Sequence, residues 1–291
     1  MRNCLTFTLL SMGVFFLQLA CRPTSSASSS SSGQVPKSFP YDLAAGRHDD
    51  MPKSLAEISG ITFHPSKSQL IYAIQDEDGI LYSYDRSQKK VLESFTFGKP
   101  GDYEDLITDG DFFYILRSDG TLFSFPFGYL GQRHQVKSFK GLLPKGEYES
   151  LGMYSSKREL YVLCKECPVD KKSGNLTGYT LLMGDGGDLK RGGQFTISMS
   201  SIQKLDPSLK NTIKPSAMTR KASTNEWYIL SSIDKLLLVA DNAFRPLEVI
   251  RFSREDFEQP EGIAFDDQEN LFISSEAGKQ NRGRIYQFNK K

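Results

Sequence analysis

The chain has 291 residues, of which 38% are hydrophobic and 24% are charged, with a formal net charge of +1 at pH 7. This length suits one large domain or two small ones. Because proteins that bind nucleic acids usually carry a basic patch, the balanced charge without a basic block argues against a nucleic-acid partner. The three histidines and four cysteines show no zinc-ligand spacing, which argues against a structural zinc site.

Residues 1–20 have the pattern of a signal peptide. Arg2 precedes an apolar run that ends at Ala20, and about 15 residues are too few for a membrane-spanning helix, which needs roughly 20. Cys21 follows directly, and the stretch resembles the lipobox of bacterial lipoproteins, although Gln18 stands where a leucine is usual. We therefore expect an exported protein with a lipid on Cys21. The alternative is an ordinary signal peptide that is cut nearby.

Residues 21–37 include a serine-rich run, TSSASSSSSG, which is typical of a flexible tether. With a lipid on Cys21, this tether would hold a folded domain at the cell envelope. The outer membrane is the expected site, on either its periplasmic or its surface face. Export also bears on Cys164 and Cys167, because disulfides form in oxidising compartments. Two interpretations stay open: a Cys164–Cys167 disulfide, or two structural thiols at the end of a strand.

A three-residue phrase recurs five times in the rest of the chain. Each copy has Ser or Glu first, a small or short residue second and a large apolar residue third. The first residues are 45, 45, 67 and 45 positions apart, so the long gap equals one period plus an insertion of 22. The copies are Ser59-Gly60-Ile61, Glu104-Asp105-Leu106, Glu149-Ser150-Leu151, Ser216-Ala217-Met218 and Glu261-Gly262-Ile263.

Each copy is followed by two apolar runs that are joined by a polar corner. The first two corners contain Asp-Gly, a pair that favours tight hairpin turns. Alternation of Tyr, Phe, Ile and Val with other residues predicts half-buried strands, and no stretch of a dozen residues shows helical periodicity. The paired runs are LIYAI with ILYSY, FFYIL with TLFSF, ELYVL with YTLLM, WYIL with LLLVA, and LFIS with RIYQF.

A period near 45 residues with about four strands in each unit predicts a β-propeller. Five repeats predict an all-β, five-bladed propeller that spans residues 38–291 as a single domain. The last unit is about one strand short, so we expect residues 38–45 to supply its outer strand and close the ring, which would protect a sheet edge. The alternatives are six blades or a β-sandwich. The period disfavours the sandwich, and the long gap is too short for two full blades.

The phrase begins the strand that we expect to lie innermost in each blade. A small second residue suits the crowding near the axis, and the apolar third residue should pack between blades. The first residues would then surround one mouth of the central channel, where three carboxylates without partners would be unfavourable. The predicted mouth residues are Glu104, Glu149, Glu261, Ser59 and Ser216.

The polar corners are expected to form a second ring around this mouth, made of Asp76, Glu77, Arg117, Lys165 and Glu276. Lys165 and Arg117 are candidate partners for the glutamates. A hard cation such as Ca²⁺ is another, because it takes six to eight oxygens from carboxylates, carbonyls and water. Two structural alternatives stay open: a salt-bridge cluster at the mouth, and solvated turns at Asp76, Glu77 and Glu276.

With these features, the chain resembles the SdiA-regulated family of bacterial exported β-propellers. The resemblance covers about residues 38–290, and the lipoprotein start with its serine tether is similar to that of Bacteroidetes members of such families. The stretches that carry it are LAEISGITF (55–63), QDEDGILYSYD (75–85), GDYEDLI (101–107), LRSDGTLF (116–123), YESLGMY (148–154), KPSAM (214–218), YILSSIDKLLLV (228–239) and QPEGIAF (259–265).

This resemblance implies an architecture more than an activity. The blade plan is similar to that of calcium-dependent lactonases and phosphoesterases of the gluconolactonase type, and to that of propeller binding modules. In those enzymes a channel cation held by Glu, Asn and Asp polarises an ester. Glu104, Glu149 and Glu261 would supply part of that set, but no Asn occupies the aligned positions and no His is placed to act as a base. We therefore expect, first, a monomeric binding module for a small ligand or an envelope protein, and second, a calcium-dependent hydrolase.

Overall fold

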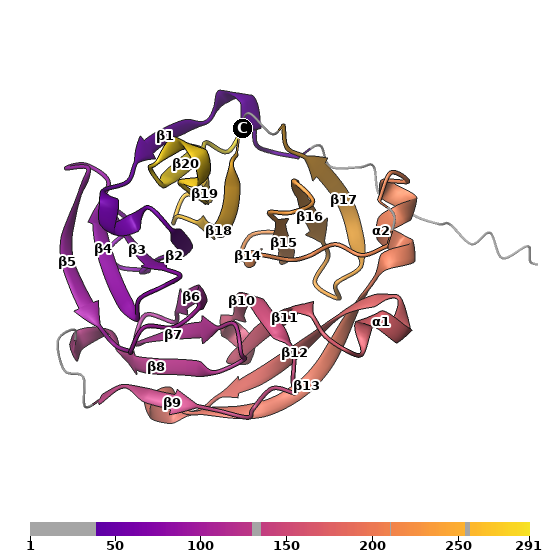
Figure 1. Cartoon of the computed structure of the whole chain (residues 1–291), viewed down its shortest axis with the longest axis horizontal. Coiled ribbons are helices and arrows are strands. Elements are labelled where there is room, and N and C mark those ends of the chain that lie inside the picture. The colour runs from indigo at the N-terminus through magenta and orange to yellow at the C-terminus, as the bar shows by residue number, and fades with distance from the viewer. Residues whose placement is uncertain (1–38, 130–134, 210, 254–256) are drawn as a thin grey trace, which may run out of the picture. The chain divides into compact units, whose positions relative to one another are not determined.

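The computed structural model describes residues 39–129, 135–209, 211–253 and 257–291. Phe39–Lys291 form one compact unit in which five four-stranded antiparallel sheets surround a common axis (Figure 1). The predicted all-β, five-bladed propeller is therefore confirmed. Among the described residues, no helix is long and apolar enough to cross a membrane. The predicted signal peptide, Cys21 and the serine tether lie outside the described residues.

Each blade is a meander in which consecutive strands pair from the axis outward. The innermost strands are β2 (Ile58–Phe63), β6 (Tyr103–Thr108), β10 (Glu147–Tyr154), β14 (Ala217–Lys221) and β18 (Gln259–Phe265). The second strands are β3 (Leu70–Gln75), β7 (Phe112–Arg117), β11 (Glu159–Glu166), β15 (Glu226–Ser231) and β19 (Leu271–Glu276). The third strands are β4 (Ile80–Asp85), β8 (Leu122–Pro126), β12 (Asn175–Met183), β16 (Leu236–Ala240) and β20 (Arg284–Phe288). The outer strands are β5 (Lys90–Thr96), β9 (Lys137–Phe139), β13 (Leu189–Ser198), β17 (Pro246–Arg251) and β1 (Arg47–Asp50).

The N-terminal segment closes the ring, but a few residues later than predicted. Strand β1 pairs with β20 over Arg47–Asp50, not over residues 38–45. Residues 43–45 form a single 3-10 turn instead, because the Asp42 carboxylate accepts a hydrogen bond from the Ala44 N–H at 3.2 Å and turns the chain. Tyr41 forms only an isolated bridge with Lys290. The closing strand, RHDD, is polar throughout and so carries no alternating pattern that would reveal it.

The insertion in the long gap enlarges the third blade. Strands β12 and β13 have 9 and 10 residues, longer than their equivalents in the other blades. A short helix, α1 (Asp170–Ser173), precedes β12, and α2 (Met199–Leu205) follows β13. Helix α2 begins at Ser198, whose hydroxyl accepts a hydrogen bond from the Ser201 N–H. Its length of seven residues is too short to show helical periodicity in the sequence.

The hydrophobic core lies between neighbouring blades and not inside any one of them. Five clusters of buried side chains fill the five blade interfaces. The third residue of each phrase lies in a different cluster, which agrees with its predicted place between blades. These residues are Ile61, Leu106, Leu151, Met218 and Ile263. Each blade therefore needs its neighbours to bury its faces, and ring closure completes the last interface.

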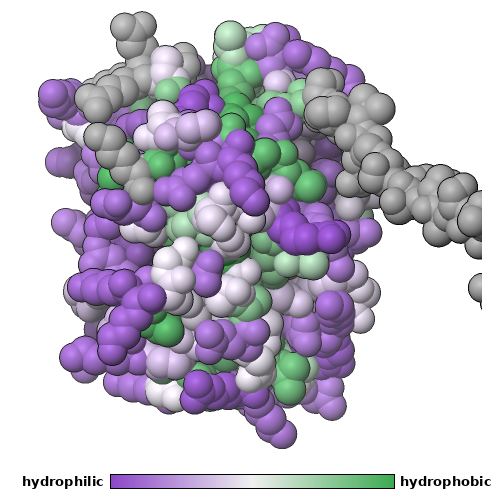
Figure 2. Space-filling model, turned by 90° about the vertical axis from the view of Figure 1, so that its right-hand side faces the viewer, coloured by the Kyte–Doolittle hydropathy of each residue, from purple (hydrophilic) through white to green (hydrophobic). Residues whose placement is uncertain are grey.

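The outer surface near α2 and β17 is mainly hydrophilic, with small groups of hydrophobic side chains between the hydrophilic ones (Figure 2). Scattered apolar residues of this kind are normal on a soluble protein surface.

Candidate functional site

A β-bulge sits at the first position of the phrase in four of the five blades. In β6, Tyr103 pairs with Arg117 and Asp105 pairs with Leu116, so Glu104 is an extra residue in its strand. Glu149 and Glu261 are extra in the same way in β10 and β18, and the pairing of β2 shifts between Ile58 and Ile61. A bulge breaks the alternation of a strand and redirects the side chain of the extra residue. It therefore explains why charged residues are tolerated at the start of strands that are otherwise buried.

The second position of the phrase is the most crowded point of the ring. A Cβ atom on Gly60 would lie 2.7 Å from the Asp105 Cα, and one on Gly262 would lie 2.4 Å from the Ser59 carbonyl oxygen. Neighbouring inner strands thus approach so closely that these two blades require glycine. This confirms the sequence argument that a small residue is needed near the axis.

Asp105 is the exception at this position, and sequence analysis missed its role. Its side chain is only 2% exposed. The carboxylate accepts hydrogen bonds from the backbone N–H groups of Leu106 at 2.9 Å and Leu151 at 2.8 Å, and from that of Met218. Burial raises the pKa of Asp105, and these three donors oppose that shift. One carboxyl group therefore ties together the inner strands of three blades at the axis. Its unusual size at a position otherwise held by Gly, Ser or Ala was the signal available in the sequence.

The predicted first-position glutamates do gather at one mouth. We call Glu104, Glu149 and Glu261 the acidic mouth. Glu149 is 7% exposed, and Glu104 and Glu261 are partly buried. Ser216 lies beside them, where its hydroxyl donates a hydrogen bond to the Pro260 carbonyl at 3.0 Å. Ser59 is 2% exposed, and its carbonyl accepts a hydrogen bond from Ser274. The two serines thus connect neighbouring blades where the other blades present carboxyl groups.

The carboxyl groups of the acidic mouth resist ionisation. Burial, followed by the charges of Glu149 and Asp102, raises the pKa of Glu104 to about 10. Burial also raises the pKa of Glu149 to about 7, against the opposing effect of Lys165. The pKa of Glu261 is raised by burial as well, although hydrogen bonds and nearby lysines lower it. These groups would ionise more readily if a further positive charge entered the mouth.

Lys165 is the cation that opposes the raised pKa of all three glutamates. Its ammonium group contacts the Glu149 carboxylate and lies 3.1 Å from the Glu147 carboxylate. Although burial opposes it, hydrogen bonding to these partners raises the pKa of Lys165. A disulfide joins Cys164 and Cys167 on either side of this segment of the chain. The disulfide is therefore placed to restrain the corner from which Lys165 reaches the mouth.

The remaining second-ring residues divide into two groups. Arg117 pairs with Asp119 at 2.6 Å in its own hairpin turn and does not contact a mouth glutamate. Burial followed by the charges of Glu57 and Glu77 raises the pKa of Asp76 to about 6, and one of its buried carboxyl oxygens makes no hydrogen bond among the described residues. Burial and the charge of Glu261 raise the pKa of Glu276 to about 8. Asp76 and Glu276 thus extend the acidic mouth, whereas Arg117 belongs to a local turn.

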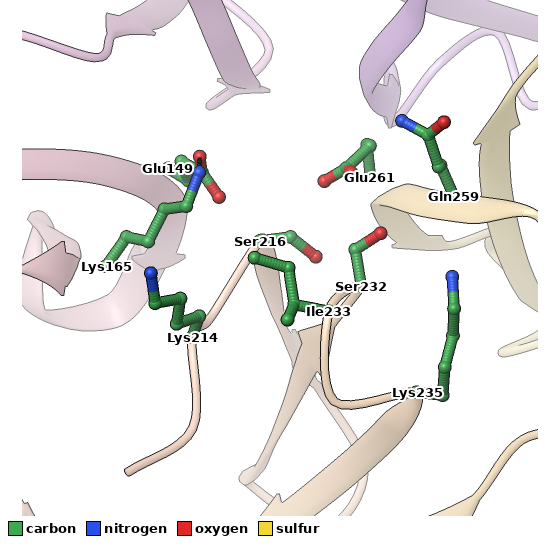
Figure 3. A pocket seen from close by; sticks show the side chains of 9 residues that line it. All are labelled: Glu149, Lys165, Lys214, Ser216, Ser232, Ile233, Lys235, Gln259 and Glu261. Carbon is green, nitrogen blue, oxygen red and sulfur yellow. Dashed lines mark hydrogen bonds and ion pairs between the residues drawn. The ribbon is translucent and has the colours of Figure 1, made fainter. Parts of the chain in front are cut away.

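A cavity of about 340 Å³ opens beside Glu149 and Glu261 (Figure 3). Glu149 and Lys165 lie together on one side, and Glu261 faces them across the cavity from the next blade but one (Figure 3). Lys214 pairs with Glu166, and Lys235 donates a hydrogen bond to the Glu258 carbonyl. Sequence analysis missed five further lining residues, because they lie on corners and strand ends that have no repeated pattern. They are Lys214, Ser232, Ile233, Lys235 and Gln259.

Comparison with protein families adds an independent finding. Residues 150–280 match the SdiA-regulated family. The resemblance predicted from the motifs is thereby confirmed. The matched region runs from within β10 to just beyond β19, and it includes the phrase copies that begin at Ser216 and Glu261. No curated protein sequence is significantly similar to the chain.

Solved structures share this propeller fold. The glutaminyl cyclase of Myxococcus xanthus has 17% sequence identity and a TM-score of 0.58, covering 84% of this chain and 94% of that one. A luciferin-regenerating enzyme has 11% identity and a TM-score of 0.48, covering 84% and 95%. A chain of a nidogen–laminin complex has 14% identity and a TM-score of 0.47, covering 75% and 72%. At such identities the similarity concerns the fold alone.

Proposed function

We propose that the protein is a binding module whose acidic mouth takes a small ligand that carries a protonated amine or a guanidinium group. One observation carries this proposal: three clustered glutamates have raised pKa values, although Lys165 opposes the shift in all three. A ligand cation would relieve the repulsion among these groups and allow them to ionise. Ser216, Ser232 and Gln259 line the same cavity and offer hydrogen bonds that would orient the ligand.

Calcium fits the acidic mouth less well than an organic cation. Calcium needs several oxygen ligands that converge at 2.3–2.6 Å. Among the described residues, only one group of three Cys, His, Asp or Glu side chains has its ligand atoms within 4.8 Å of one another, and it consists of Cys164, Cys167 and Asp170. Both of these cysteines are joined in the disulfide. The mouth glutamates do not form such a group, and the Lys165 ammonium contacts Glu149 in the place where a metal would compete with it.

A hydrolase remains the second candidate, and one observation favours it. Glu104 and Glu149 are neighbours whose pKa values differ, at about 10 and about 7. Such a pair can supply a proton donor and a proton acceptor at neutral pH. In a hydrolase of an ester or lactone, Glu149 would act as the base and Glu104 as the acid. The described residues around the cavity include no nucleophile–histidine pair, so binding is the better-supported function.

We place this binding module at the cell envelope. The support is the signal-peptide pattern of residues 1–20 and the lipobox-like Cys21, followed by the tether. The ligand would be a small molecule or a cationic side chain of an envelope protein. Mass spectrometry of the membrane fraction tests the anchor: the proposal expects a diacylglyceryl modification on Cys21, and an unmodified N-terminus at a different residue would overturn it.

Titration calorimetry tests the ligand class. Putrescine, agmatine and calcium chloride would be titrated separately into the purified protein, with Glu261→Gln and Glu149→Gln as site variants. Glu93→Gln is the matched control, because Glu93 is exposed on the outer strand β5. The proposal expects saturable binding of at least one amine, weakened about tenfold or more by either site variant and unchanged in the control. Saturation by calcium alone would favour a metal site, and no saturable binding of either amine would overturn the proposal.

A further inference from the structure

A second and larger cavity lies at the other end of the channel. The inner strands all start at the acidic mouth, so their last residues lie at the opposite mouth. With a rise of about 3.3 Å per residue, Thr108 is roughly 13 Å along β6 from Glu104. Residues from the ends of all five inner strands line a cavity of about 790 Å³ there. We call it the distal cavity.

Asp105 separates the distal cavity from the acidic mouth. Leu106, Leu151 and Met218 line the distal cavity, and their backbone N–H groups all donate to the Asp105 carboxylate. Asp105 is 2% exposed, and its carboxylate bridges the inner strands of three blades between the two spaces. A molecule in the distal cavity would therefore meet different side chains from one at the acidic mouth.

Apolar side chains from all five blades form about half of the wall of the distal cavity. Phe63, Ile107, Met153 and Phe265 come from four different blades, and each is only partly buried. Apolar side chains at the end of a concave cavity favour a ligand with an apolar body, because burying that surface releases water. The volume lies within the 300–1,000 Å³ range of small-molecule pockets. Enclosure by five strands suits a small molecule better than a protein surface.

Three of the five charged residues that line the distal cavity are paired within the protein, namely Asp266, Glu269 and Lys290. Glu269 accepts hydrogen bonds from Lys290 at 2.6 Å and from Ser223. Asp266 lies 3.7 Å from the Arg86 guanidinium. The Arg220 guanidinium donates to Asn225, and it lies 3.5 Å from the ring centroid of Tyr154. The two other charged residues, Asp267 and Arg220, have opposite signs. A charged ligand would have to disrupt the pairs or meet a like charge, so the lining favours a ligand without net charge.

Two hydroxyl groups in the wall are available for hydrogen bonding. Thr62 and Thr219 stand at the fourth position of the phrase copies that begin with Ser59 and Ser216. Both line the distal cavity, and within the described chain neither hydroxyl makes a hydrogen bond to the protein. The buried hydroxyl of Thr108, by contrast, donates to the Phe112 carbonyl at 2.8 Å. Thr62 and Thr219 are therefore the polar groups that a ligand would satisfy.

We propose that the distal cavity is a second ligand site that takes a neutral, mainly apolar organic molecule with oxygen or nitrogen atoms in reach of Thr62 and Thr219. This site is independent of the acidic mouth in both position and chemistry. The apolar wall binds the body of the ligand, and the two hydroxyls orient it. The three carboxylates at the rim, Asp266, Asp267 and Glu269, disfavour anions.

Nile red, a neutral dye whose fluorescence rises in apolar surroundings, tests this proposal. We expect saturable binding of one equivalent to the purified protein. Met153→Glu places an unpaired carboxylate in the wall and should weaken binding at least tenfold. Thr219→Val keeps the shape of the side chain, removes the hydroxyl and should weaken binding by about threefold. Glu149→Gln alters the acidic mouth only and should leave the dye affinity unchanged.

The outcomes separate clearly. Uptake of dye without saturation, or an affinity in Met153→Glu equal to that of the wild type, would overturn the proposal. If Met153→Glu does not fold, as judged by circular dichroism, Thr219→Val decides, and an unchanged affinity in that variant overturns the proposal. The anionic dye 8-anilinonaphthalene-1-sulfonate should bind at least tenfold more weakly than Nile red. Equal affinity for the two dyes would refute the assignment to a neutral ligand.

Discussion

Replacing Glu104 by Gln should make the protein more stable at neutral pH. Burial and neighbouring carboxylates raise the pKa of Glu104 from 4.5 to about 10, so the folded protein holds a proton there that the unfolded chain releases. A group with a raised pKa in the folded state stabilises the fold fully below its unfolded pKa. That stability is lost as the pH rises toward the folded pKa. Gln is neutral at every pH and removes this loss.

The size of the effect follows from the two pKa values. Between pH 4.5 and 7, the folded state binds one more proton than the unfolded state at this site, so the free energy of unfolding falls by about 1.4 kcal/mol per pH unit. Over these 2.5 pH units the free energy of unfolding of a protein with a fully buried group would fall by roughly 3 kcal/mol. Because Glu104 is only partly buried, screening by water reduces the expected gain of E104Q to about 2 kcal/mol. At pH 4 the variant and the wild type should be equally stable.

Urea unfolding followed by circular dichroism, repeated at pH 4, 5.5 and 7, measures this difference. Glu93→Gln is the matched control, because the same chemical change on the exposed outer strand should alter stability by less than about 0.5 kcal/mol at any pH. If E104Q and the wild type lose stability in parallel from pH 4 to pH 7, Glu104 is not a strained carboxyl group. A lower stability of E104Q at pH 7 would refute the reasoning outright.

Three further predictions concern the residues that hold the channel. Asp105→Ala should lower the free energy of unfolding by about 3 kcal/mol, since three buried N–H groups lose their acceptor. Asp105→Asn keeps one acceptor oxygen and should lower it by less. Equal losses in the two variants would contradict this role of Asp105. Gly60→Ala should lower the free energy of unfolding by at least about 2 kcal/mol, because the added Cβ meets the Asp105 backbone. Gly128→Ala should lower it far less, because a Cβ at Gly128 has nothing within 4 Å. Similar thermal melting of both variants would disprove the crowding at Gly60. Lys165→Met should lower the free energy of unfolding by about 2 kcal/mol at pH 8, and by less at pH 5, where Glu149 is protonated. The same loss at both pH values, measured by urea unfolding, would show that Lys165 acts through packing alone.

The fold could be predicted from the sequence because each blade of the propeller has the same sequence pattern. Each blade buries its faces against its neighbours, so the same apolar residue recurs at the third position of every phrase, as in Ile61 and Ile263. The Asp-Gly corners and the alternating runs then fix the order of strands within a blade. The closing strand was misplaced because Arg47–Asp50 are charged and polar on both sides of the strand. Such a strand is identified by its partner β20 and not by its own pattern.

Only part of the candidate site could be predicted from the sequence. Counting positions was enough to bring Glu104, Glu149 and Glu261 together, since equal positions in equal blades must meet around the axis. The bulge that turns these side chains into the mouth depends on the register between strands, which no single strand encodes. Lys214 and Lys235 were missed because they come from corners of different length. Arg117 was assigned to the mouth, but Asp119, two residues away in the same turn, is its partner.

Proton release on ligand binding tests the central claim most directly. A cation that enters the acidic mouth must lower the raised pKa values of the glutamates, and at pH 7 Glu149 is about half protonated. Titration of the protein with the amine that binds, in two buffers of different ionisation enthalpy, gives the number of protons released. The account predicts release of between about 0.5 and 1 proton per bound amine at pH 7, reduced by about half a proton in Glu149→Gln. Binding with no proton release, or with proton uptake, would contradict it.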